Sequence, residues 1–133
     1  MLRLGWMAAG CATIVMICFT LGLFNWFPTI IYGGSMSPAL RTGDVVIVSK
    51  VSANSIEIGD IVQFAAPGGD HLHRVVEING AGRHRTFITQ GDANINPDPE
   101  PVSSSQIKGR VLFNFPNMGW VAVGVRNLLF SPD

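Results

Sequence analysis

The chain has 133 residues, with nine basic and nine acidic side chains and a formal net charge of zero at pH 7. This length supports one modest domain and an anchor, but not a second full domain. A chain without a basic block lacks the electrostatic footprint of nucleic-acid-binding proteins. Both cysteines, Cys11 and Cys18, lie in the hydrophobic N-terminal run. The rest of the chain therefore offers neither a thiol nucleophile nor a cysteine zinc site.

The N-terminal run, Leu4 to Phe24, carries no charged side chain. A helix needs ~20 such residues to cross the hydrocarbon core of a bilayer. The alternative is a cleaved signal peptide, which would have a shorter apolar core and a small-x-small cleavage site that Leu23–Trp26 does not provide. We predict an uncleaved anchor over residues 1–27, with one transmembrane helix over about 4–24. Arg3 favours an N-terminus inside the cell and a domain outside it.

Beyond the anchor, short β-branched runs alternate with turn residues, which is typical of a mostly β domain. Gly-Asp pairs at 43–44 and 59–60 directly precede two of these runs, where the carboxylate is expected to cap the turn. We expect a β-rich domain over residues 28–116, whose small sheet folds over or closes into a barrel to hide its edges. The expected strands are 45–48, 61–64, 72–78, 86–89 and 109–115.

The C-terminal segment, residues 117–133, is short and hydrophobic. Gly119 to Phe130 is apolar except for Arg126 and Asn127, and it is too short to span a membrane. It could form an interfacial helix, a final packed segment, or part of a longer hydrophobic hairpin. Of these we favour the interfacial helix.

Ser35 follows Gly33 and Gly34 shortly after the anchor. Two glycines leave the backbone open around the hydroxyl, which is the setting that a nucleophilic serine needs. The alternative is a flexible Gly/Ser linker. The two lysines, Lys50 and Lys108, do not lie in surroundings that suggest a desolvated amine base.

Histidine and aspartate supply the other candidates. His71 and His73 alternate within an expected strand and therefore share one face, and either could be an ordinary surface histidine. Asp92 and Asp98 bracket a loop of turn residues, where most aspartates cap turns.

The chain carries five sequence boxes in the order in which type I signal peptidases carry them, and it resembles that family from the anchor to about Val111. The boxes are Gly34-Ser35-Met36-Ser37-Pro38, Gly43-Asp44-Val45-Val46, Gly59-Asp60-Ile61-Val62, His73-Arg74-Val75-Val76, and Gln90-Gly91-Asp92-Ala93-Asn94 followed by Asp98. The resemblance implies a membrane-anchored serine peptidase with an extracytoplasmic, mostly β domain. Histidine at position 73, where the common bacterial enzymes have lysine, resembles the endoplasmic reticulum, archaeal and some Gram-positive enzymes.

The resemblance also implies roles for individual residues. Ser35 would be the nucleophile, its backbone N–H would stabilise the oxyanion, and His73 would be the general base. Asp98 would orient the imidazole, with Asp92 as the competing candidate. Many relatives carry a serine two residues before the nucleophile, where this chain has Gly33. No metal or organic cofactor is expected.

The function implied is removal of signal peptides from exported preproteins after small side chains. The expected enzyme is a single-pass protein of the cell membrane, with the preproteins, the bilayer and export-machinery or peptidase-complex subunits as partners. The alternative is a non-catalytic membrane-anchored β module that binds an export partner. Self-cleaving repressor peptidases have a similar serine box, but they use a lysine base and usually carry a DNA-binding region, and neither is expected in this chain.

Overall fold

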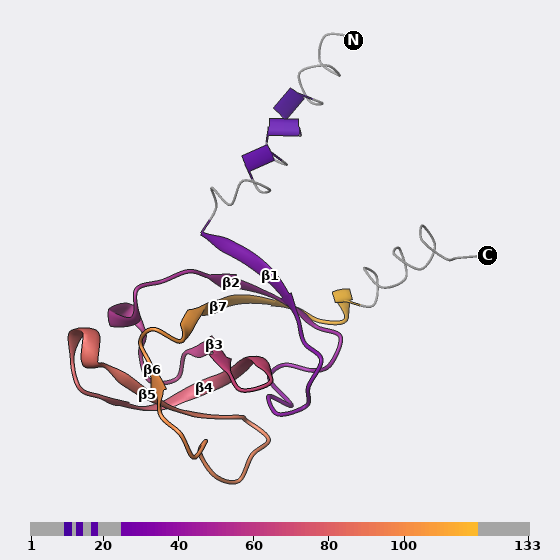
Figure 1. Cartoon of the computed structure of the whole chain (residues 1–133). Helices are drawn as coiled ribbons and strands as arrows, with labels where there is room; N and C mark the ends of the chain where they lie inside the picture. The colour runs from indigo at the N-terminus through magenta and orange to yellow at the C-terminus, as the bar shows by residue number, and fades with distance from the viewer. Residues whose placement is uncertain (1–9, 12, 15–16, 19–24, 120–133) are drawn as a thin grey trace.

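A computed structural model describes residues 10, 11, 13, 14, 17, 18 and 25–119 of the chain (Figure 1). Within these residues one seven-stranded antiparallel sheet has the order β1-β2-β7-β3-β4-β5-β6. The elements are β1 (Trp26–Ile30), β2 (Val45–Ser49), η1 (Ala53–Ser55), β3 (Ile61–Ala66), β4 (Gly69–Asn79), η2 (Gly82–His84), β5 (Thr86–Gln90), β6 (Val102–Ser103) and β7 (Ile107–Phe115), where η1 and η2 are 3₁₀ turns. The prediction of a mostly β domain is confirmed for this part of the chain.

The predicted membrane helix and the predicted interfacial segment lie largely outside the described residues. The described residues within 4–24 are helical, and so are Met118 and Gly119. None of the helical stretches among the described residues is long and apolar enough to cross a membrane.

The five expected strands are all present, and the sheet has two more. β4 begins at Gly69 instead of Leu72, because residues 66–69 form a tight turn that pairs Ala66 with Gly69. β1 was not expected as a strand. It contains Pro28, which cannot donate to a ladder and is tolerated because β1 is an edge strand, which among residues 25–119 pairs with β2 alone.

The sheet buries two hydrophobic clusters, which we call the first and the second cluster. The side chains of Val46 and Val48 share one face of β2 and are part of the second cluster. This cluster also contains the buried side chains of Met36 and Leu40. This packing anchors the loop between β1 and β2 to the sheet, and Ser35 lies in that loop. The first cluster consists of Ile56, Val62, Phe64, Val75, Phe87 and Val102.

The sheet curls strongly along its length. Thr29 on β1 donates a hydrogen bond of 2.9 Å to the side chain of Gln63 on β3, although β2 and β7 lie between these strands in the sheet. Both pairings of β7 contain a register shift, the kind of irregularity that bends a strand and increases its twist. The sheet therefore folds over, as expected, while β1 and β6 remain edge strands.

The first two Gly-Asp pairs form the expected capped turns. Gly43 and Gly59 have φ of 92° and 99°, a conformation that suits glycine. The carboxylate of Asp44 accepts the backbone N–H of Arg41 at 3.0 Å, and that of Asp60 accepts the N–H of Glu57 at 2.9 Å. The capping prediction is therefore confirmed at both turns.

Asp44 also ties the end of β7 to the loop that carries Ser35. Its carboxylate accepts hydrogen bonds from the side chain of Asn114 at 3.1 Å and from the backbone N–H of Asn117 at 3.0 Å. Burial disfavours the charged form of this carboxyl, but the bonds from Arg41, Asn117 and Asn114 outweigh it and hold its pKa below the ordinary value. A depressed pKa in the folded protein means that the carboxylate stabilises the fold above the unfolded pKa. That stabilisation is lost as the pH falls through the folded pKa.

We expect Asp44→Asn to lower the free energy of unfolding by about 1–3 kcal/mol at pH 7, because the amide offers one acceptor oxygen and no charge. The difference from the wild type should shrink in acid, where the wild-type carboxyl is protonated as well. Urea unfolding across this pH range measures both effects. Glu100→Gln, at an exposed position, is the control. A difference that stays constant with pH would contradict this account of Asp44.

Candidate active site

Ser35 lies in a compact turn held by the second cluster. The N–H of Ser37 donates to the carbonyl of Gly34 at 3.0 Å, and the N–H of Leu40 donates to the carbonyl of Met36 at 2.9 Å. Met36 and Leu40 are each only 2% exposed, whereas Ser35 is half-buried. Since the residue next to Ser35 is anchored in the core, the serine hydroxyl is presented from a fixed backbone.

His73 lies on β4 between Ser35 and Asp98. Its Nε2 is 3.1 Å from the Oγ of Ser35, and its Nδ1 is 2.6 Å from Oδ2 of Asp98. An ionised carboxylate only accepts hydrogen bonds, so Nδ1 carries the proton of a neutral imidazole. Nε2 is then an acceptor, and the hydroxyl of Ser35 donates to it. The side chain of His73 is 10% exposed, with the ring of Phe64 edge-on at 6.2 Å.

Thr89 fixes the position of Asp98. Its hydroxyl donates to Oδ2 of Asp98 at 2.6 Å, and its carbonyl accepts the backbone N–H of Asp98 at 2.7 Å. Thr89 is fully buried on β5 and was not among the sequence candidates. Strand alternation could have identified Thr89, because it places the hydroxyl on the same buried face as Phe87. A polar group on a buried face needs a hydrogen-bond partner.

Asp92 lies on the opposite side of β4 from this chain of contacts. Arg74 donates to Oδ1 of Asp92 through Nε at 2.9 Å and to Oδ2 through Nη2 at 2.7 Å. This hydrogen bonding is the main cause that raises the pKa of the Arg74 guanidinium, against the opposing effect of burial. Arg74 also donates to the carbonyl of Gly59 at 2.8 Å. The sequence predicted that Asp92 caps its loop by accepting backbone N–H groups, but both of its carboxylate oxygens accept hydrogen bonds from Arg74.

The loop that contains Asp92 presses directly against the Ser35 turn. The backbone N–H of Ala93 donates to the carbonyl of Ser35 at 2.8 Å. A Cβ added to Gly91 would lie 2.6 Å from the same carbonyl oxygen, closer than real Cβ contacts allow. Glycine at this position therefore permits the close approach of the two loops.

His71 shares a face with His73, as the strand pattern predicts, and their ring centroids are 6.1 Å apart. It is exposed, and its ring centroid lies 6.0 Å from that of Phe64, with the two rings tilted by 59°. The structure thus joins Ser35, His73 and Asp98 by hydrogen bonds, and within residues 25–119 the side chains of His71 and Asp92 make no hydrogen bond to this group.

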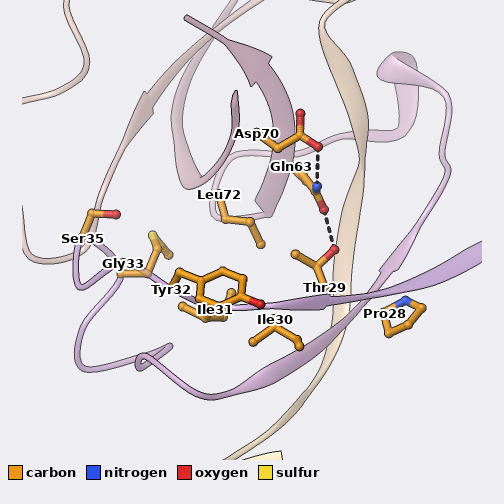
Figure 2. A pocket seen from close by; sticks show the side chains of 11 residues that line it. Pro28, Thr29, Ile30, Ile31, Tyr32, Gly33, Ser35, Gln63, Asp70 and Leu72 are labelled. Carbon is orange, nitrogen blue, oxygen red and sulfur yellow. Dashed lines mark hydrogen bonds between the residues drawn. The ribbon is translucent and has the colours of Figure 1, made fainter. Parts of the chain in front are cut away.

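A cleft of about 500 Å³ runs from Ser35 along β1 (Figure 2). Sequence reasoning missed this cleft because its wall is the strand that was not expected. Gly33 lines it, and a Cβ added there would meet nothing within 4 Å. The residues that line the cleft are Pro28, Thr29, Ile30, Ile31, Tyr32, Gly33, Ser35, Met36, Gln63, Asp70 and Leu72.

No metal site accompanies this geometry in the part of the chain that the structure describes. Among those residues, no three His, Cys, Asp or Glu side chains lie close enough together to hold a metal ion.

Comparison with known proteins gives the family. Signal peptidase I W of Bacillus subtilis is 29% identical over 90 residues, which cover 66% of this chain and 47% of that protein. The signal peptidase complex catalytic subunits sec11 of Neurospora crassa and SEC11 of Colletotrichum graminicola are 30% and 31% identical over 104 residues, or 71% of this chain. The chain spans 60% of the length of these fungal proteins. The family model described as signal peptidase, peptidase S26, matches residues 3–97. The chain therefore belongs to the signal peptidase family, peptidase S26.

Proposed function

We propose that this protein is a membrane-bound serine endopeptidase that removes N-terminal signal peptides from exported preproteins. The observation that carries the proposal is the continuous hydrogen-bonded chain from the Ser35 hydroxyl through His73 to Asp98. A hydroxyl that donates to a neutral imidazole, itself oriented by a carboxylate, is the arrangement of a serine hydrolase. The similar proteins described above are named as signal peptidases, which favours this substrate class.

In the proposed reaction the Oγ of Ser35 attacks the carbonyl carbon of the peptide bond while Nε2 of His73 takes the hydroxyl proton. His73 then gives this proton to the leaving amine as the C–N bond breaks, and an ester links the signal peptide to Ser35. A water molecule attacks the ester with His73 again as base, which releases the carboxylic acid and restores the serine.

The negative oxygen of the tetrahedral intermediate needs a donor close to Ser35. Within residues 25–119, the backbone N–H of Ser35 makes no hydrogen bond, so it is free for this purpose. Gly33 brings no hydroxyl to the site. The oxyanion is therefore held by a backbone donor alone, which is a weaker site than one with an added side chain.

The outer edge of β1 at Ile30 is suited to an extended substrate. Ile31 bonds to Asp44 on the β2 side, so strand alternation turns the N–H and C=O of Ile30 toward the other edge. A peptide added as a strand along this edge would pass through the cleft to Ser35.

A membrane surface next to this domain would fit its exposed apolar side chains. Trp26, Phe113 and Phe115 are 53%, 60% and 46% exposed, and Trp26 and Phe113 line one apolar hollow of about 150 Å³. Aromatic rings of this kind favour the membrane interface. We propose that the segment before Trp26 anchors the protein in the cell membrane, with the domain on the extracytoplasmic side and subunits of an export or peptidase complex as further partners.

The proposal is tested with the full chain in detergent and a model preprotein. We expect Ser35→Ala and His73→Ala to abolish cleavage, because they remove the nucleophile and the base. Ser37→Ala and His71→Ala are the matched controls, since they change neighbouring groups of the same kind, and they should retain most of the activity. Cleavage by Ser35→Ala at the wild-type rate would favour the non-catalytic module instead.

The two aspartates should separate turnover from stability. Asp98→Asn can favour the wrong imidazole tautomer, so we expect a folded protein whose turnover falls by several orders of magnitude. Asp92→Asn loses half of its bidentate pair with Arg74, and it should lower the thermal midpoint while turnover stays closer to normal. The thermal midpoint and turnover of both variants are to be measured. The opposite result would assign the catalytic role to Asp92.

Gly33→Ser should raise the rate. The open space around Gly33 accommodates the side chain, and its hydroxyl can add a second donor for the oxyanion. One such donor contributes up to about 10²–10³ in turnover in other serine peptidases, and we expect a smaller gain, about tenfold, because the surroundings are not built for it. Gly33→Ala is the control for the added Cβ alone. Equal rates for the two variants would contradict this role.

A further inference from the structure

A row of hydrogen-bonded polar side chains lies in the cleft at a distance from Ser35 (Figure 2). Thr29 donates to Oε1 of Gln63 at 2.9 Å, and Nε2 of Gln63 donates to Oδ2 of Asp70 at 2.9 Å. The ammonium group of Lys108 lies 2.7 Å from Oδ1 and 2.9 Å from Oδ2 of Asp70. These four side chains come from β1, β3, β4 and β7.

The direction of each hydrogen bond in this row is determined by the carboxylate. The hydrogen bond from Lys108 is the main cause that lowers the pKa of Asp70, so this group is ionised and can only accept. The amide nitrogen of Gln63 must therefore face Asp70, and the amide oxygen faces Thr29. Thr29 then donates its only hydroxyl hydrogen to Gln63, and the lone pairs of its oxygen remain free.

The accessible polar atoms of the row are consequently acceptors. Gln63 is only 4% exposed, so its amide lies beneath the surface of the cleft. Thr29 is half-buried and Asp70 is exposed, and both line the cleft. Oδ2 of Asp70 accepts hydrogen bonds from Gln63 and Lys108, and Oδ1 has a contact only with Lys108 among the described residues. Oδ1 and the Oγ of Thr29 therefore each keep a lone pair for a further donor. Because Lys108 balances the charge of Asp70, a cationic side chain has little advantage over a neutral donor here.

We propose that this part of the cleft selects a neutral hydrogen-bond donor, a serine or threonine hydroxyl, in the substrate segment that lies along β1. The inference rests on the proposed peptidase function. An aliphatic side chain at the same place would shield the oxygens of Thr29 and Asp70 from solvent without offering them a donor.

The test compares threonine with valine, which has nearly the same shape without the hydroxyl. The peptide substrates come in pairs that differ at one position, where one peptide has threonine and the other has valine. One pair is made for each position on either side of the cut, and kcat/KM is measured with the full chain in detergent. At one position the wild type should cleave the threonine peptide about 2- to 10-fold better than the valine peptide. At that position a lysine peptide should not be better than the threonine peptide.

Thr29→Val removes one of the two acceptors and keeps the shape of the side chain, so the ratio should fall toward one. Thr86→Val, on β5 and outside the residues that line the cleft, is the matched control and should keep the wild-type ratio. A ratio near one at all positions in the wild type, an unchanged ratio in Thr29→Val, or a clear preference for lysine would each overturn the inference while peptidase function stands. If the wild type cleaves none of the peptides, like Ser35→Ala, the proposed function fails and this inference with it.

Discussion

The hydrogen bond between His73 and Asp98 determines what the rest of the site can do. The carboxylate places the imidazole proton on Nδ1 and leaves Nε2 as the acceptor that faces Ser35. Thr89 holds the carboxylate in place from β5. On the other side of β4, Arg74 donates a hydrogen bond to the carboxylate of Asp92. This second carboxylate of the same loop therefore does not compete for the imidazole. Asp98 and Asp92, from one loop, thus bind side chains on opposite faces of β4.

Much of the sheet could be predicted from alternation and turn residues. The apolar runs at 45–48 and 61–64 are short and bounded by turn residues, which marked them as strands. In β2 only Val46 and Val48 of this run are fully buried, whereas in β3 Val62, Gln63 and Phe64 are buried on both faces. β1 was missed because its aromatic residues and Pro28 are equally typical of a membrane interface. β6 has only two residues, too few for any periodicity. The sequence led us to expect that the sheet folds over, but it did not show the register shifts of β7 or the contact between Thr29 and Gln63.

The candidate active site, like the sheet, was predicted only in part from the sequence. The order of the sequence boxes predicted Ser35, His73 and Asp98 as a group, and their proposed roles remain predictions. The spacing alone did not separate Asp98 from Asp92, because the difference lies in their partners. Thr89 and Gln63 were missed since each is defined by a hydrogen bond to another strand or loop. Such partners are visible only once the strands are placed in order.

The wide separation of the three central residues along the chain has a consequence for folding. His73 lies 38 residues after Ser35 and 25 residues before Asp98. Each contact therefore requires a long loop to close, and the entropy of closure must be offset by the surrounding sheet. Local structure alone cannot pair the hydroxyl with the imidazole, so a partly folded chain lacks this pair. The contact between Ser35 and His73 thus belongs to the completed domain, and a newly made chain cannot acquire it before β4 has joined the sheet.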